Sequence, residues 1–189
     1  MGKSTLAAAL AKQAACPLLA TDTMGQHPGR PWTRHIEPVM AFYEALPADA
    51  HLWFLHAHHR TLKPLIGNAI AEANRAGTFV MEGAALRPEY FADWDVPSNQ
   101  AVCLWAPDDT LTARIQQNSR YADQPDRLKG AIDAFLARSL HENAMLRAVA
   151  EAFGVEVINT DGLSKDAVLA QLKNSNGDRH PLLTKSSDG

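Results

Sequence analysis

The sequence predicts an α/β domain with a parallel sheet, and two observations favour this class. Short apolar runs of the kind that form buried strands alternate along the chain with longer segments of helical periodicity. Each apolar run is also followed within a few residues by an acidic side chain. Strands that alternate with helices pair in parallel, because each helix returns the chain to the same end of the sheet.

The predicted strands are short and bounded by helix ends or turn residues. They cover residues 18–20, 78–81, 101–105 and 155–158, and the acids that follow them are Asp22, Glu82, Asp108 and Asp161. In parallel α/β sheets, ligands bind beyond the carboxyl ends of the strands. We therefore expect three of these four acids to border one cleft.

The segments between the strands predict helices over residues 3–14, 36–46, 48–76, 108–117, 126–153 and 164–173. Leu6 and Leu10 lie one turn apart in an alanine-rich first helix of high propensity. In the long helix over 48–76, apolar residues recur every three or four positions, and Pro64 should kink or divide it. The segment 25–32 contains two glycines and two prolines, which predict a loop, and its polar side chains suggest that it faces a substrate.

Composition limits the possible partners and the compartment. With 189 residues, the chain fits one domain over residues 1–173, followed by a polar, disordered tail over 174–189. The net charge of −3 gives no electrostatic reason to expect a nucleic acid or an anionic membrane as partner. No apolar run approaches the roughly 20 residues that span a bilayer. Cys16 and Cys103 lie in apolar surroundings, which predicts reduced thiols and a cytoplasmic protein.

The residues Gly2-Lys3-Ser4-Thr5, at the start of the first helix, match the second half of the phosphate-binding P-loop, G-x-x-x-x-G-K-[ST]. In such a loop the glycine lets the backbone approach a phosphate, and the amides at the helix start point at the anion. The lysine reaches the outer phosphates, while the serine hydroxyl coordinates Mg²⁺. The alternative is a frayed polar start to an ordinary helix.

On these residues, and on 79–83 and 114–127, the chain resembles the P-loop small-molecule kinases, related to nucleoside-monophosphate, shikimate and zeta-toxin-like kinases. Around residues 21–23 and 27–32 it is similar to proteins described as AAA-family ATPases or 2-phosphoglycerate-kinase-like. The resemblance covers about residues 1–162. It implies a three-layer P-loop NTPase fold whose central first strand, between the strands at Phe79 and Val102, is missing from this chain. Either Met1 is an internal methionine, which we favour, or the chain is a fragment that binds ATP poorly.

The resemblance also implies roles for individual residues. Gly2, Lys3, Ser4 and Thr5 would bind ATP, and Ser4 with Glu82 would hold Mg²⁺. Asp22 would orient or deprotonate the acceptor hydroxyl, although it can also merely cap the following turn. The remaining candidates are arginines: Arg114, Arg120 and Arg127 would stabilise the transferring phosphoryl group from a mobile lid, and Arg30 and Arg34 would hold an anionic acceptor. The alternative for each arginine is a solvated surface position.

Two further features of the helices favour packing over chemistry. His51, His56, His58 and His59 have no carboxylate at ligand spacing, so we expect helix histidines and no metal site. Ser139 and Asn143, on the inward face of the helix over 126–153, are expected to bond either to the lid or to backbone.

The sequence therefore predicts ATP-dependent phosphoryl transfer to a small hydroxylated metabolite, with Mg²⁺ as cofactor. Simple NTP hydrolysis remains an alternative. A nucleotide-binding module that has lost catalysis and acts through a partner is the other.

Overall fold

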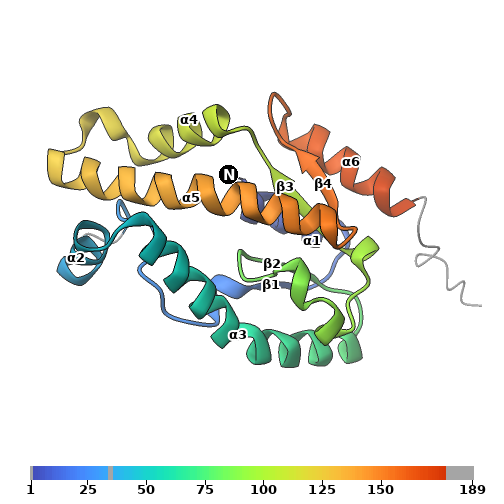
Figure 1. The fold of residues 1–189 in the computed structure, drawn as a ribbon. Coiled ribbons are helices and arrows are strands. Elements are labelled where there is room, and N and C mark those ends of the chain that lie inside the picture. Colours follow the sequence, from blue (N-terminus) through green and yellow to red (C-terminus); the bar gives the residue numbers. More distant parts are fainter. Residues whose placement is uncertain (1, 34–35, 178–189) are drawn as a thin grey trace, which may run out of the picture.

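The computed structural model describes residues 2–33 and 36–177, and the fold is a mixed α/β arrangement in which helices predominate (Figure 1). The helices are α1 (Lys3–Gln13), α2 (Glu37–Ala45), α3 (Ala48–Ala76), α4 (Asp108–Ser119), α5 (Asp126–Ala152) and α6 (Lys165–Gly177). The strands are β1 (Leu18–Ala20), β2 (Val80–Glu82), β3 (Val102–Trp105) and β4 (Glu156–Asn159). Each lies where the sequence predicts it, with ends shifted by a few residues.

The four strands form two separate parallel pairs, β1 with β2 and β3 with β4. The parallel pairing confirms that part of the prediction, but the strands do not form the single parallel sheet that the sequence predicts. Within the described residues, no ladder joins β2 to β3. This break falls where the resemblance expects a further strand.

Helix α1 connects the two strand pairs. It packs on β1 and β2 and also contacts α6. Its buried Leu6 belongs to a cluster with Ile158 of β4 and residues of α6, against which Val102 and Leu104 of β3 pack. Ala7 and Ala11, which follow Leu6, are buried and small enough to let the helix lie close to its neighbours. As a result, the amino-terminal end of α1 is fixed relative to both pairs.

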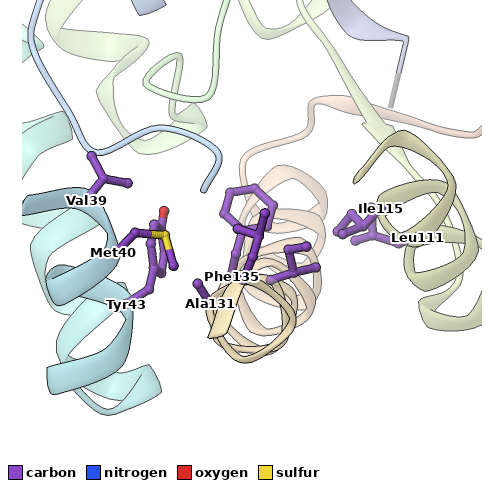
Figure 2. Close-up of a cluster of buried hydrophobic side chains, with 9 residues drawn as sticks. Val39, Met40, Tyr43, Leu111, Ile115, Ala131 and Phe135 are labelled. Atoms are coloured by element: carbon purple, nitrogen blue, oxygen red, sulfur yellow. The ribbon is translucent and has the colours of Figure 1, made fainter. Parts of the chain in front are cut away.

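Helix α5 crosses the molecule and contacts α2, α3, α4, β3 and β4 (Figure 1). Its residues Ala131, Ile132 and Phe135 are almost completely buried. They pack between α2 and α4 in the largest apolar cluster, and Figure 2 shows Met40 and Tyr43 of α2 on one side of them and Leu111 and Ile115 of α4 on the other. The hairpin of α4 and α5 is thereby joined to α2.

Three predicted boundaries differ from the structure. Pro64 does not divide α3, because Pro64 and Arg60, whose carbonyl it would otherwise crowd, both lie on the exposed side of the helix, where water can satisfy that carbonyl. Helix α4 extends two residues past its predicted end and stops at Arg120, which adopts a left-handed conformation. Helix α6 reaches Gly177, inside the predicted tail, whereas residues 178–189 lie outside the described part. In the described part, no helix is long and apolar enough to cross a bilayer.

Candidate active site

The first turn of α1 meets the end of β2 through Glu82. Lys3 Nζ lies 2.5 Å from Glu82 Oε2, and Ser4 Oγ donates a hydrogen bond of 3.0 Å to Glu82 Oε1. Glu82 is almost completely buried, whereas the Lys3 side chain is 36% exposed. Residues 78 positions apart in the sequence therefore form one polar centre that solvent reaches from the lysine side.

Gly2 gives this centre its backbone. It adopts a left-handed conformation (φ 71°, ψ −6°) as the residue before α1, which favours glycine because a side chain there is strained. The Leu6 amide donates to the Gly2 carbonyl, so the amides of Lys3, Ser4 and Thr5 precede the first hydrogen bond of the helix. Their donors and the helix dipole favour an anion at this end. Thr5 is exposed.

The ends of β1 and β2 lie side by side at the same centre. Ala20 pairs with Glu82 in the ladder, so Asp22 lies just beyond the same edge of the strands. The segments that follow the two strands approach each other closely, because a Cβ on Gly83 would lie 1.6 Å from Thr21 Oγ1. Thr21 is buried, and its hydroxyl has no hydrogen-bond partner in the described part of the chain. Asp22 itself is exposed. One edge of the β1–β2 pair thus carries four residues that the sequence analysis selected separately: Lys3, Ser4, Glu82 and Asp22.

The three arginines assigned to a lid lie on the α4–α5 hairpin and differ in their contacts. Arg114 donates 2.8 Å and 2.7 Å hydrogen bonds to the side chain and carbonyl of Thr160, just after β4. Arg127 forms ion pairs with Glu37 and Glu44 of α2, at 2.6 Å and 2.5 Å. The guanidinium group of Arg114 therefore connects α4 to the residue after β4, and that of Arg127 connects α5 to α2. Arg120 differs, because its exposed side chain borders an open hollow of about 320 Å³ at the tip of the hairpin.

The loop over 25–32 is irregular, as the sequence predicts, and it is attached to α2 and α5. Tyr43 donates a 2.5 Å hydrogen bond to the Gly29 carbonyl, and Trp32 packs edge-on against Phe135 of α5, with ring centroids 5.1 Å apart. Arg30 is exposed, with its guanidinium carbon 5.9 Å from the centre of the Trp32 ring. Arg34 lies outside the described residues.

A buried ionic network behind β2 was not predicted. Arg87, which is 4% exposed, donates to Glu89 and, at 2.7 Å, to Glu142 of α5. The second oxygen of Glu142 lies 2.6 Å from Nε2 of His56 in α3. No local spacing signals this network, because its members come from three elements far apart in the chain. The sequence signal for this network is weak: Arg87 lies close in the sequence to Glu82, which the sequence analysis had selected.

The helix histidines pack against neighbouring residues, and one of them, His56, also has a carboxylate partner. His51 is buried, and its Nε2 lies 2.9 Å from the Phe42 carbonyl. Burial chiefly, and then the positive charge of Arg87, lowers the pKa of His59 to about 3, so this ring is neutral in the folded protein. Ser139 and Asn143 both donate to backbone carbonyls, those of Phe135 and Ala106. The carboxylate partner of His56 comes from α5 and is invisible in the spacing of α3.

Chemically, the centre at Lys3 and Glu82 combines an ammonium group, free helix amides, a hydroxyl and a buried carboxylate. The ammonium group and the helix amides suit a phosphate chain. Mg²⁺ takes oxygen ligands and keeps several waters, so one hydroxyl and one carboxylate beside a phosphate chain suffice for it. Ser4 and Glu82, already within hydrogen-bond distance of each other, provide that pair. Among residues 2–33 and 36–177, no group of three or more His, Cys, Asp or Glu side chains could hold a metal ion, so Ser4 and Glu82 fit Mg²⁺ only together with a phosphate chain.

Comparisons of this chain with protein-family models, with curated proteins and with solved structures found no match.

Proposed function

We propose that this protein transfers a phosphoryl group from ATP to a hydroxyl group of a small metabolite. The observation that carries the proposal is the convergence of Lys3 and Ser4, at the start of α1, on Glu82, at the end of β2. These residues lie far apart in the sequence, and phosphate chemistry accounts for all three together. A frayed helix start would not require a buried carboxylate opposite it.

On the nucleotide side, the first-turn amides of α1 and Lys3 bind the phosphate chain. Lys3 exchanges its contact with Glu82 for the phosphates, and its charge offsets the negative charge that develops in the transition state. The partial exposure of its side chain permits this movement. Ser4 and Glu82 would hold Mg²⁺, which would neutralise part of the negative charge of the phosphates.

On the acceptor side, Asp22 orients the hydroxyl and accepts its proton. The ladder between β1 and β2 supports this role, because it places Asp22 beside the end of the strand that carries Glu82. Among the arginines, Arg120 is the candidate for contacting the transferring phosphoryl group from the hairpin tip, because Arg114 and Arg127 have structural partners.

The test measures ATP consumption by the 189-residue chain with Mg²⁺ and a panel of hydroxylated metabolites, together with ATP binding by calorimetry. We expect one class of metabolite to accelerate consumption. Lys3→Ala should abolish the acceleration and weaken ATP binding about tenfold to a hundredfold, because a charged hydrogen-bond donor to phosphate is lost. Lys12→Ala is the matched control, since Lys12 is an exposed lysine in the last turn of the same helix.

Three other results would contradict the proposal and separate the alternatives. ATP consumption at one constant rate with every metabolite would identify a hydrolase. ATP binding without consumption would identify a binding module. Equal ATP binding by the Lys3→Ala and Lys12→Ala chains would remove α1 from the site altogether.

A further inference from the structure

Arg138, in the middle of α5, has an unusual environment for an arginine. Its Nε is buried and has no hydrogen-bond partner in the described part of the chain. Its guanidinium carbon lies 4.7 Å from the centre of the Phe135 ring, and burial is the main cause that lowers its pKa below the ordinary value. Within residues 2–33 and 36–177, the one hydrogen bond that it donates is a long one of 3.5 Å to Ser139. Removing a guanidinium from water without a strong partner is unfavourable, so such a group selects for an anionic ligand.

The nearest carboxylate does not meet this need. Glu142 lies one turn further along α5 and attracts Arg138 electrostatically. However, one of its oxygens accepts from Arg87 and the other lies 2.6 Å from His56. Among residues 2–33 and 36–177, no carboxylate lies within 4.0 Å of the Arg138 guanidinium, in contrast to Arg87 and Arg127. Arg138 also keeps part of its surface exposed.

The surroundings of Arg138 lead back to the acceptor side of the site. Arg138 is close enough to His59 of α3 to lower the pKa of that ring. Burial chiefly lowers the pKa of the adjacent His58, and the charge of Asp22 opposes this effect and raises it. A Cβ on Gly25, in the loop after Asp22, would lie 3.0 Å from the His58 ring. The rings in this region are close to one another: the His58 centroid lies 6.3 Å from that of His59 and 5.7 Å from that of His27, in the loop after Asp22.

The loop over 25–32 closes the same region from the other side. Its Trp32 packs on Phe135, one turn before Arg138, and its Gly29 accepts a hydrogen bond from Tyr43. Tyr43 also interacts electrostatically with Arg138. The Arg138 guanidinium thus lies beside the Phe135 ring, against which the loop packs from another side, and apolar surroundings strengthen its attraction for an oxyanion.

We propose that Arg138 binds the anionic group of the acceptor, so that the substrate is a hydroxylated metabolite carrying a carboxylate or a phosphate. The inference rests on the proposed function, because it assigns a ligand to the acceptor side of that site. The guanidinium provides two parallel donors to one oxyanion, a geometry that fits carboxylate and phosphate groups alike. The hydroxyl to be phosphorylated then lies toward Asp22.

The experiment follows the Arg138 Nε–H signal by NMR while the 189-residue chain is titrated separately with inorganic phosphate and with glycolate. The signal is assigned by its loss in Arg138→Lys. Calorimetric titrations then compare Arg138→Gln with Arg147→Gln. Arg147 is the matched control, because it lies on the same helix with its guanidinium carbon 4.3 Å from the centre of the Trp105 ring, but has its own carboxylate, Glu151, at 2.8 Å.

We expect one of the two probes to move the Arg138 signal and so to identify the anion. Binding of that probe should weaken about tenfold to a hundredfold in Arg138→Gln and remain unchanged in Arg147→Gln. If neither probe moves the Arg138 signal, the inference is overturned, and this result needs no variant to fold. Equal binding by the two glutamine variants would overturn it as well.

The outcome is independent of the nucleotide test. A chain that fails to bind ATP but shows the Arg138 response loses the proposed function and keeps the anion site. A chain that consumes ATP with an uncharged acceptor, and shows no Arg138 response, keeps the function and loses this inference.

Discussion

At the scale of single residues, polar groups in this protein are buried where another part of the chain faces them. Glu82 is buried opposite Lys3 and Ser4, and Arg87 is buried between Glu89 and Glu142. Truncating one member of such a group leaves the others buried and unpaired, which is costlier than losing an exposed ion pair. His59 is one of several exceptions: within the described residues its Nδ1 has no hydrogen-bond partner, and neither do Thr21 Oγ1, His51 Nδ1 and Arg138 Nε.

This property of His59 gives the folded protein a specific sensitivity to acid. An imidazole in the unfolded chain titrates near its ordinary pKa of 6.5, whereas burial lowers the pKa of His59 to about 3. Between these values only the unfolded state binds the proton, so the free energy of unfolding falls as the pH falls below 6.5. From pH 7 to pH 5 the contribution of His59 to this loss is about 2 kcal/mol.

Urea unfolding at pH 7 and pH 5 checks this prediction. His59→Leu should be less sensitive to the pH change than the parent chain by that amount, since leucine suits the buried face and does not titrate. His141→Leu, at an exposed position of α5, should keep the full sensitivity of the parent. If His59→Leu lost as much stability as the parent over this range, His59 would not be the buried neutral group described here.

At the scale of elements, the same substitution has opposite consequences in α3 and α5. Gly130 lies on the exposed side of α5, and a Cβ there meets nothing within 4 Å. Gly67 lies in α3, where a Cβ would be 2.8 Å from the buried Trp94 ring, which is itself held by a 3.1 Å hydrogen bond to the Lys63 carbonyl. The difference is one of packing alone, because both glycines are inside helices.

We therefore expect Gly130→Ala to stabilise the protein by about 0.5–1 kcal/mol, the usual gain from replacing glycine in a helix. Gly67→Ala should destabilise it, because the gain in helix propensity is smaller than the cost of displacing Trp94. Chemical denaturation of the two variants measures both changes. A gain in stability for Gly67→Ala would show that Trp94 is not packed against α3 as described.

Element positions were predictable because they depend on local patterns. The helical spacing of Leu62, Ile66 and Ile70 identified α3 and its buried face, and all three side chains are buried. The contacts of the site were only partly predictable. The motif at Lys3 and the acid after β2 could be selected from the sequence, but Arg87, Glu142 and Arg138 could not, because their environment is created by three elements that meet only in the folded chain.

At the scale of the whole molecule, two parallel strand pairs are held together by α1 and α5. Leu6 of α1 packs among residues of β3, β4 and α6, while the first turn of the same helix contacts β2 through Lys3 and Ser4. Helix α5 spans the molecule from the hairpin tip to β3 and β4 (Figure 1). The candidate site thus lies where α1, the helix that contacts both strand pairs, begins.

The central claim is that the start of α1 and the end of β2 together receive the phosphates of a nucleotide. Amide NMR of the chain during titration with MgATP tests it most directly. We expect the largest shifts at the amides of Lys3, Ser4, Thr5 and Gly83, and hardly any shift at those of α2. Shifts confined to other elements, or no shifts at millimolar MgATP, would contradict it.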